Sequence, residues 1–237
     1  MATYKILSAL LSYPTVELQR AEQELIRTLN SERLLRTGSA TGIVALVREI
    51  AGADLLEAQS RYVDLFDRTR ALSLHLFEHV HGESRDRGQA MVSLLERYQH
   101  AGLDVATKEL PDYIPLFLEF LSTQEETEAR DNLAECAHIV AALGERLRQR
   151  GSSYAAVFEA LTELSRVAPN GEALTELRKE KIEEPHDFAA LDRIWEEAEV
   201  RFGPADAGVG GCPRAHDILQ RMNVAPPAQA SSREAGL

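Results

Sequence analysis

Hydrophobic residues recur at intervals of three or four positions along almost the whole chain. In one segment Ile43, Leu46, Val47 and Ile50 form an i, i+3, i+4, i+7 stripe, which is the pattern of an amphipathic α-helix. The same spacing marks residues 4–12, 15–29, 39–50, 54–66, 85–100, 125–150, 157–164 and 188–198. No stretch shows the sustained alternation with β-branched residues that is typical of strands. Because amphipathic helices bury their stripes against one another, the pattern predicts a single-domain, all-α helical bundle.

One predicted helix, residues 112–121, differs because it is apolar on nearly all sides. A helix of this kind belongs in the middle of a bundle, so we expect it to form the centre of the core. Asp112 could cap this helix, and Pro115 is tolerated in its first turn, where N–H groups have no intrahelical acceptor. By similar reasoning, Pro14 ends the first helix and Thr15 caps the second.

The helical pattern stops near residue 202, so we expect one all-helical domain over residues 1–202. Residues 203–237 form a tail rich in glycine and proline. Such a composition cannot bury enough apolar surface to offset the entropy lost on ordering, and we expect disorder from about residue 223.

The net charge of the chain is −12, from 26 basic and 38 acidic residues. This balance argues against nucleic-acid binding and against docking on anionic lipid, and it suits a basic partner segment. No apolar stretch is long enough to span a membrane, and the N-terminus does not resemble a signal peptide. The 2 cysteines are not paired in a C-x-x-C motif, so a reducing cytoplasm is the simpler location.

The densest polar cluster lies in residues 75–88, where three histidines and two glutamates fall within nine positions. On a helix, His75, Glu78 and His79 could share a metal ion, and a metal-dependent enzyme is one alternative. The spacing is not H-E-x-x-H, however, and the chain has no nucleophile elbow. A second interpretation is a polar helix end, with a break at 81–82 and a cap at Ser84. A third is a peptide-recognition surface, because ionisable groups lie beside apolar ones.

The same region resembles the NarJ family, the assembly chaperones (delta subunits) of respiratory nitrate reductase. The segment 76–91, LFEHVHGESRDRGQAM, is similar to the first family motif. The segment 109–116, ELPDYIPL, is similar to the second, in which related molybdoenzyme chaperones have an acidic residue, Pro-Asp and then an aromatic residue or His. Residues 10–14, 65–68 and 195–197 are similar too, and the likeness covers about residues 4–202.

The resemblance implies an all-helical fold like that of the twin-arginine-system chaperones of molybdoenzymes. It implies binding to the N-terminal segment of the catalytic alpha subunit of nitrate reductase. The chaperone would hold that subunit in the cytoplasm until the iron–sulfur cluster and molybdenum cofactor are inserted, and would be absent from the finished membrane complex. It also implies no catalysis and no resident cofactor, with molybdenum cofactor biosynthesis proteins as further partners. Direct carriage of the molybdenum cofactor is an alternative, but no phosphate-cradling motif supports it.

By the same resemblance, the peptide site lies along residues 77–87 and 111–115. We expect apolar contacts, acidic groups facing client cations, and two histidines that could make affinity depend on pH. Helix capping remains an equal alternative for Asp112, and we favour intramolecular pairing for Arg87, with Asp86, Asp67 or Glu83 as its partner. The expected apolar contacts are Phe77 and Tyr113, the acids are Glu78, Glu83, Asp86 and Asp112, the histidines are His79 and His81, and the remaining site residues are Arg87, Pro111 and Pro115.

Overall fold

The computed structural model describes residues 1–80, 85–103, 105 and 109–179 of the chain. These residues fall within the first of two units, residues 1–192. The second unit, residues 193–237, lies outside the described residues, as do the expected helix at 188–198, the expected boundary near 202 and the tail.

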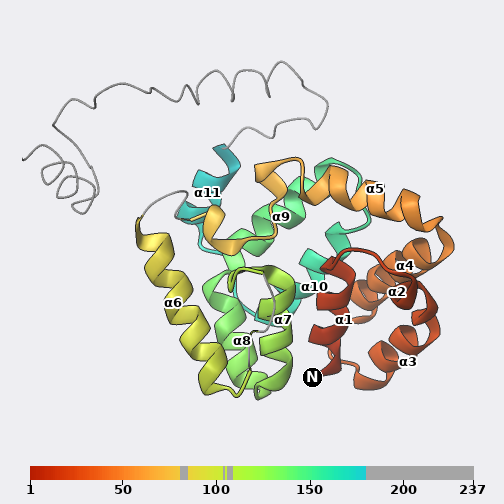
Figure 1. Ribbon diagram of the computed structural model, residues 1–237, viewed down its shortest axis with the longest axis horizontal. Coiled ribbons are helices and arrows are strands. Elements are labelled where there is room, and N and C mark those ends of the chain that lie inside the picture. Colours follow the sequence, from red (N-terminus) through yellow and green to blue (C-terminus); the bar gives the residue numbers. More distant parts are fainter. Residues whose placement is uncertain (81–84, 104, 106–108, 180–237) are drawn as a thin grey trace, which may run out of the picture. The chain divides into compact units, whose positions relative to one another are not determined.

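The described part of the chain is helical, with no strand beyond one isolated β-bridge between His75 and Tyr113. The predicted all-α class is therefore confirmed (Figure 1). The helices are α1 (Ala2–Leu11), α2 (Val16–Arg20), α3 (Glu22–Glu32), α4 (Thr37–Gly52), α5 (Leu55–Phe66), α6 (Arg85–His100), α7 (Ile114–Thr123), α8 (Glu126–Glu135), α9 (Ala137–Gln149), α10 (Ala155–Ser165) and α11 (Gly171–Lys179), with short 3₁₀ turns η1 (Arg70–Leu72) and η2 (Leu76–Glu78).

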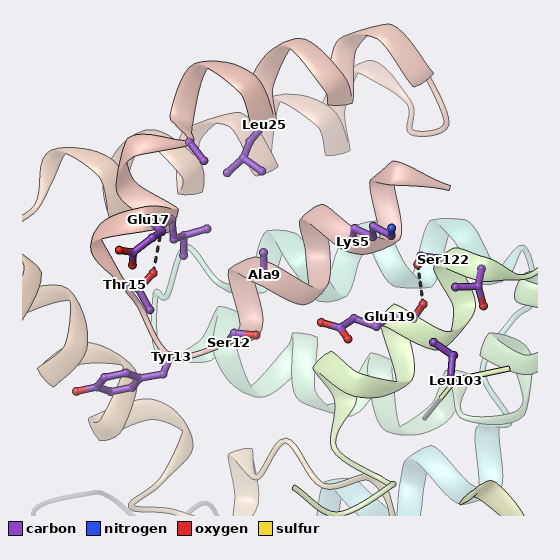
Figure 2. Close-up of a pocket in the computed structure, with 13 residues that line it drawn as sticks. Lys5, Ala9, Ser12, Tyr13, Thr15, Glu17, Leu25, Leu103, Glu119 and Ser122 are labelled. Atoms are coloured by element: carbon purple, nitrogen blue, oxygen red, sulfur yellow. Dashed lines mark hydrogen bonds between the residues drawn. The ribbon is translucent and has the colours of Figure 1, made fainter. Parts of the chain in front are cut away.

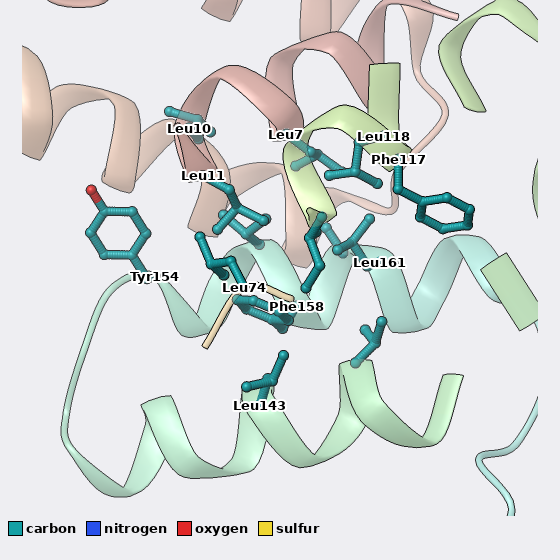
Figure 3. Close-up of a cluster of buried hydrophobic side chains, with 14 of the residues drawn as sticks. Leu7, Leu10, Leu11, Leu74, Phe117, Leu118, Leu143, Tyr154, Phe158 and Leu161 are labelled. Atoms are coloured by element: carbon teal, nitrogen blue, oxygen red, sulfur yellow. The ribbon is translucent and has the colours of Figure 1, made fainter. Parts of the chain in front are cut away.

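Helix α7 lies at the centre of the hydrophobic core, as its all-round apolar sequence predicts. Its Leu118 and Leu121 are fully buried, and the helix packs along α1, while α10 packs on both α9 and α4. Figure 3 shows Leu7 of α1 and Leu118 of α7 close together above Phe158 of α10. Seven of its ten residues are buried, while Glu119 and Thr123 are exposed, so most of the helix surface packs against other parts of the fold.

The predicted stripes face this core. Ile43, Leu46, Val47 and Ile50 of α4 are all at most 5 % exposed. Helix α6 begins and ends where its periodicity predicts, at residues 85 and 100. The expected caps are confirmed for α2, where the Thr15 hydroxyl accepts the Leu18 N–H at 3.2 Å; at the start of α5 the Asp54 carboxylate caps in the same way.

Two long helices expected from the pattern are each divided in the structure. The segment 15–29 breaks at Ala21 into α2 and α3, and the segment 125–150 breaks at Cys136 into α8 and α9. Neither position has the proline or glycine that signals a break. At Cys136 the backbone turns to φ −106° and ψ 13°, and the side chain remains in the core, 8 % exposed.

Helix α11, which the sequence pattern does not predict, is joined to α9 by hydrogen bonds from a buried arginine. Arg146 of α9 is 4 % exposed; its guanidinium donates to the carbonyl of Ala71 at 2.7 Å and to the carbonyl of Leu177 at 2.5 Å. Buried charge needs such partners. None of the described helices has the length and hydrophobicity needed to cross a membrane.

Candidate functional site

The two motifs that are separated in the sequence lie side by side in the structure. The Leu76 N–H donates to the carbonyl of Asp112 at 3.0 Å, and the Ile114 N–H donates to the carbonyl of Leu74 at 2.8 Å. These two backbone bonds form the short antiparallel bridge between the segment before η2 and the segment before α7. The structure therefore brings residues 77–80 and 111–113 into one region.

The carboxylate of Asp112 is the centre of this region and has no exposed surface. Its Oδ2 accepts the Phe77 N–H at 3.1 Å, and its Oδ1 lies 3.2 Å from His75 Nδ1. Arg87 Nη2 lies 4.0 Å from Oδ2. The hydrogen bond to Asp112 is the main cause that raises the pKa of His75 above its usual range, against the opposing effect of burial. A protonated His75 is therefore favoured next to the carboxylate.

This geometry corrects both roles expected for Asp112. It does not cap α7, whose N-cap is Tyr113 without a side-chain capping bond. It also cannot face the cations of a client, because its carboxylate is enclosed and already bonded. Its structural role is to hold the η2 segment against the start of α7.

Other expected site residues are also buried. Pro115 lies in the core, where its carbonyl accepts the Ser8 hydroxyl at 2.8 Å. His79 is 9 % exposed, and its Nε2 lies 2.9 Å from the carbonyl of Ser73. Neither side chain is placed for direct contact with a peptide. Phe77, Glu78, Arg87, Pro111 and Tyr113 are half-buried and remain accessible.

Arg87 pairs within the molecule, but with a different acid from those considered from sequence. Its Nη2 lies 3.3 Å from Glu78 Oε1, while Nε has no hydrogen-bond partner among the described residues. His81 and Glu83 lie outside the described residues, and Asp86 is described only in its backbone.

The proposed metal cluster does not form. His75 precedes η2 and His79 follows it, so the two histidines do not share the face of an α-helix. Their ring nitrogens point to different partners, Asp112 and the Ser73 carbonyl. Among the described residues no group of three metal-ligating side chains comes together.

Tyr113 connects this region to a third motif segment, residues 10–14. Its hydroxyl lies 3.1 Å from that of Tyr62, which donates to the carbonyl of Leu11 at 2.8 Å. A phenol has one proton to donate, so Tyr113 is the donor to Tyr62. Burial raises the pKa of both phenols, so both hydroxyls stay protonated and remain hydrogen-bond donors.

A cavity of about 340 Å³ opens beside η2, between α6, α7 and the junction of α8 and α9. Val80 lies at this cavity and is 51 % exposed. Arg97 and Glu135 form an exposed ion pair at its edge, 3.2 Å apart. The lining residues are Leu76, Phe77, Val80, Ala90, Ser93, Leu94, Arg97, Phe117, Asn132, Glu135, Cys136, His138 and Ile139. Sequence reasoning missed the contribution of residues 132–139, because nothing local relates them to the motifs.

A second hollow, of about 670 Å³, lies between α1, the α2–α3 pair and α7 (Figure 2). Its lining includes Ser12 and Tyr13 of the 10–14 segment. Figure 2 shows Lys5 of α1 and Glu119 of α7 on the same side of this hollow. With Glu17 also lining it, the hollow carries one basic and two acidic side chains.

Comparison with known proteins agrees with these motifs. Residues 32–160 match the family described as nitrate reductase delta subunit. The nitrate reductase molybdenum cofactor assembly chaperone NarJ of Escherichia coli K12 is 42 % identical over 205 residues, 86 % of each chain. The probable chaperone NarW of the same strain is 38 % identical over 203 residues, 85 % of this chain and 84 % of that one. The probable chaperone NarJ of Bacillus subtilis is 32 % identical over 170 residues, 67 % of this chain and 85 % of that one.

Proposed function

Because the chain belongs to the nitrate reductase delta subunit family, we propose that it is an assembly chaperone that binds the N-terminal segment of the catalytic alpha subunit of nitrate reductase. Its relatives NarJ and NarW are named as molybdenum cofactor assembly chaperones. This is a family of chaperones and not of enzymes, so the metal-dependent enzyme considered from sequence is set aside.

The observation that carries this proposal is the cavity beside η2. Phe77 and Val80 stand at an opening whose lining is largely apolar, on a segment that Asp112 holds in place. An amphipathic peptide helix can insert apolar side chains into such a cavity and leave its polar face in water. Micromolar affinity, about −8 kcal/mol, would allow a client to be both held and released.

Charge at the edge of the cavity supports a basic client. The side chain of Glu135 is 66 % exposed, and its partner Arg97 is 43 % exposed. An ion pair this exposed is worth little, so Glu135 can accept a client lysine or arginine, while Arg97 keeps its hydrogen bond to the Asn132 side chain. The net charge of −12 would speed the encounter with a basic segment more than it would raise the affinity.

The chaperone would hold the alpha subunit in the cytoplasm while the molybdenum cofactor and iron–sulfur cluster are inserted, and would then leave. In this proposal it has no resident cofactor of its own and takes no part in the finished membrane enzyme. The phenylalanine and valine at the cavity are its contact residues, and Asp112 positions them.

Isothermal titration of the full chain with the N-terminal peptide of the alpha subunit, at low salt, tests the proposal. Val80→Asn removes an apolar contact at the cavity without adding charge and should weaken binding at least tenfold. Val92→Asn is the matched control, because Val92 is 50 % exposed but does not line the cavity; it should change binding less than twofold. No heat at tens of micromolar with the wild-type chain, or equal effects of the two variants, would contradict the proposal.

A further inference from the structure

A groove of about 670 Å³ runs between α3 and α4, which lie side by side (Figure 1). It is separate from the cavity beside η2 and shares no lining residue with it. The groove is lined by Ile26, Leu29, Asn30, Arg33, Leu35, Thr37, Ala40, Thr41, Val44 and Arg48.

The charge of this groove is opposite to that of the chain as a whole. Arg33 and Arg48 are both exposed, and no acidic residue lines the groove. Most other arginines of the described residues pair with a carboxylate, as Arg61 does with Glu49. Within the described part of the chain, the guanidinium groups of the two groove arginines make neither a hydrogen bond nor an ion pair.

The acids that could neutralise these arginines are engaged elsewhere. Glu32, next to Arg33 in the chain, accepts hydrogen bonds from the Ala2 and Thr3 backbone N–H groups of α1. Glu49, next to Arg48, pairs with Arg61 of α5. Both carboxylates are thereby held at other helix contacts, and the groove lining itself contains no acidic residue.

Between the arginines the groove is apolar. Ile26 from α3, with Ala40 and Val44 from α4, are partly buried hydrophobic residues that pack against the core from its outer side. Val44 lies one residue from the stripe that begins at Ile43, so the outer part of α4 keeps apolar surface open to solvent. A strip of apolar side chains with cations beside it matches an amphipathic helix whose apolar stripe is bordered by carboxylates.

We propose that the α3–α4 groove is a docking site for an acidic amphipathic helix of a partner protein, a second site distinct from the one for the basic client peptide. A small anion such as phosphate is a poorer match, because its sites gather several donors around one point, whereas these arginines border an apolar strip. The two sites share no lining residue and would select partners of opposite charge.

Two synthetic 18-residue helical peptides with the same Leu/Ala apolar face test this proposal, one carrying Glu and the other Lys on the polar face. Their binding to the full chain is measured by fluorescence anisotropy at fixed ionic strength. We expect the Glu peptide to bind at the groove. The Lys peptide carries the charge of the proposed client and can also bind at the cavity beside η2, so for that peptide only the change caused by the groove variants is compared. Arg33→Glu combined with Arg48→Glu should weaken binding of the Glu peptide at least tenfold and strengthen binding of the Lys peptide.

A control with the same change in net charge is Arg20→Glu combined with Arg70→Glu, because these arginines are exposed but do not line the groove. It should weaken the Glu peptide less than threefold. Equal weakening in both double variants would mean general electrostatics and would overturn the proposal, as would the absence of binding by the Glu peptide. Displacement of the peptide by inorganic phosphate at the same ionic strength would also overturn it, in favour of an anion site. Circular dichroism melting of each variant checks that it is folded.

Discussion

Replacing Asp112 with asparagine tests whether a buried carboxylate holds the η2 segment in place. Asparagine has nearly the same shape, and its remaining oxygen can still accept the Phe77 N–H. The change removes the negative charge that faces His75 at 3.2 Å and Arg87 at 4.0 Å. Asp112→Asn therefore isolates the charge from the packing.

The expected loss follows from the burial of the three groups. A hydrogen bond to a charged group contributes about 1.5–3 kcal/mol, and removing one member of a fully buried ion pair costs about 3–5 kcal/mol. The side chains of His75 and Arg87 are 25 % and 20 % exposed, and Arg87 keeps Glu78 as a partner. We therefore expect the free energy of unfolding to fall by about 2 kcal/mol, near the lower of these ranges.

The loss should depend on pH in a defined direction. The pKa of His75 is raised in the folded chain, mainly by its hydrogen bond to Asp112. Such a group adds stability that is fully present below its unfolded pKa, about 6.5, and that disappears as the pH rises through the higher folded pKa. The difference between the wild-type chain and Asp112→Asn should therefore be larger at pH 6 than at pH 9.

Urea unfolding followed by circular dichroism, at both pH values, gives the two differences. Asp131→Asn is the control, because its side chain is 71 % exposed and its ion pair with Arg130 should be worth less than about 0.5 kcal/mol. A loss below about 0.5 kcal/mol for Asp112→Asn at pH 6, comparable with that control, would refute the positioning role. The same loss at both pH values would refute the coupling to His75.

Three further predictions concern buried groups. Burial raises the pKa of Cys136 to about 12. In a variant whose other cysteine is replaced by serine, its thiol should therefore react with a disulfide reagent at pH 8 only when the chain unfolds. Fast labelling of the native chain would contradict this. In Gly144→Val the new Cβ would lie 3.1 Å from the Cβ of Phe158, so urea unfolding should show a loss of about 1–3 kcal/mol, and no loss would mean that α9 and α10 separate easily. Tyr113→Phe removes the donor to Tyr62 and should lower stability by about 0.5–1.5 kcal/mol in the same assay; an unchanged midpoint would show that water replaces this donor.

Most of the fold could be predicted because helix periodicity is a local property. The stripe of α4 and the bounds of α6 follow from residues only three or four positions apart. The breaks at Ala21 and Cys136 could not be predicted in this way, since both residues are compatible with a helix. Contacts between helices distant in the sequence decide such breaks, and periodicity does not report those contacts.

The candidate site was predictable to a smaller extent. The motifs correctly indicated that residues near 77 and near 112 belong together, but not that Asp112 turns inward. A Pro-Asp pair before an apolar helix is also what a helix cap looks like, so the sequence alone allowed both roles. The far wall of the cavity, including Cys136 and Ile139, comes from helices with no motif of their own.

Asp112 is a charged residue at a buried position, where an apolar side chain could also pack, and the bonds of its carboxylate explain its presence. For stability alone an apolar side chain would serve as well, since buried ion pairs are often no better than hydrophobic contacts. It could not, however, accept the Phe77 N–H or orient His75. The carboxylate therefore fixes a position: through the Phe77 N–H it holds the η2 segment against the start of α7. In the proposed complex, the motif acts through the geometry it imposes, and the groups that contact the client are the apolar pair and the exposed Glu135 at the edge.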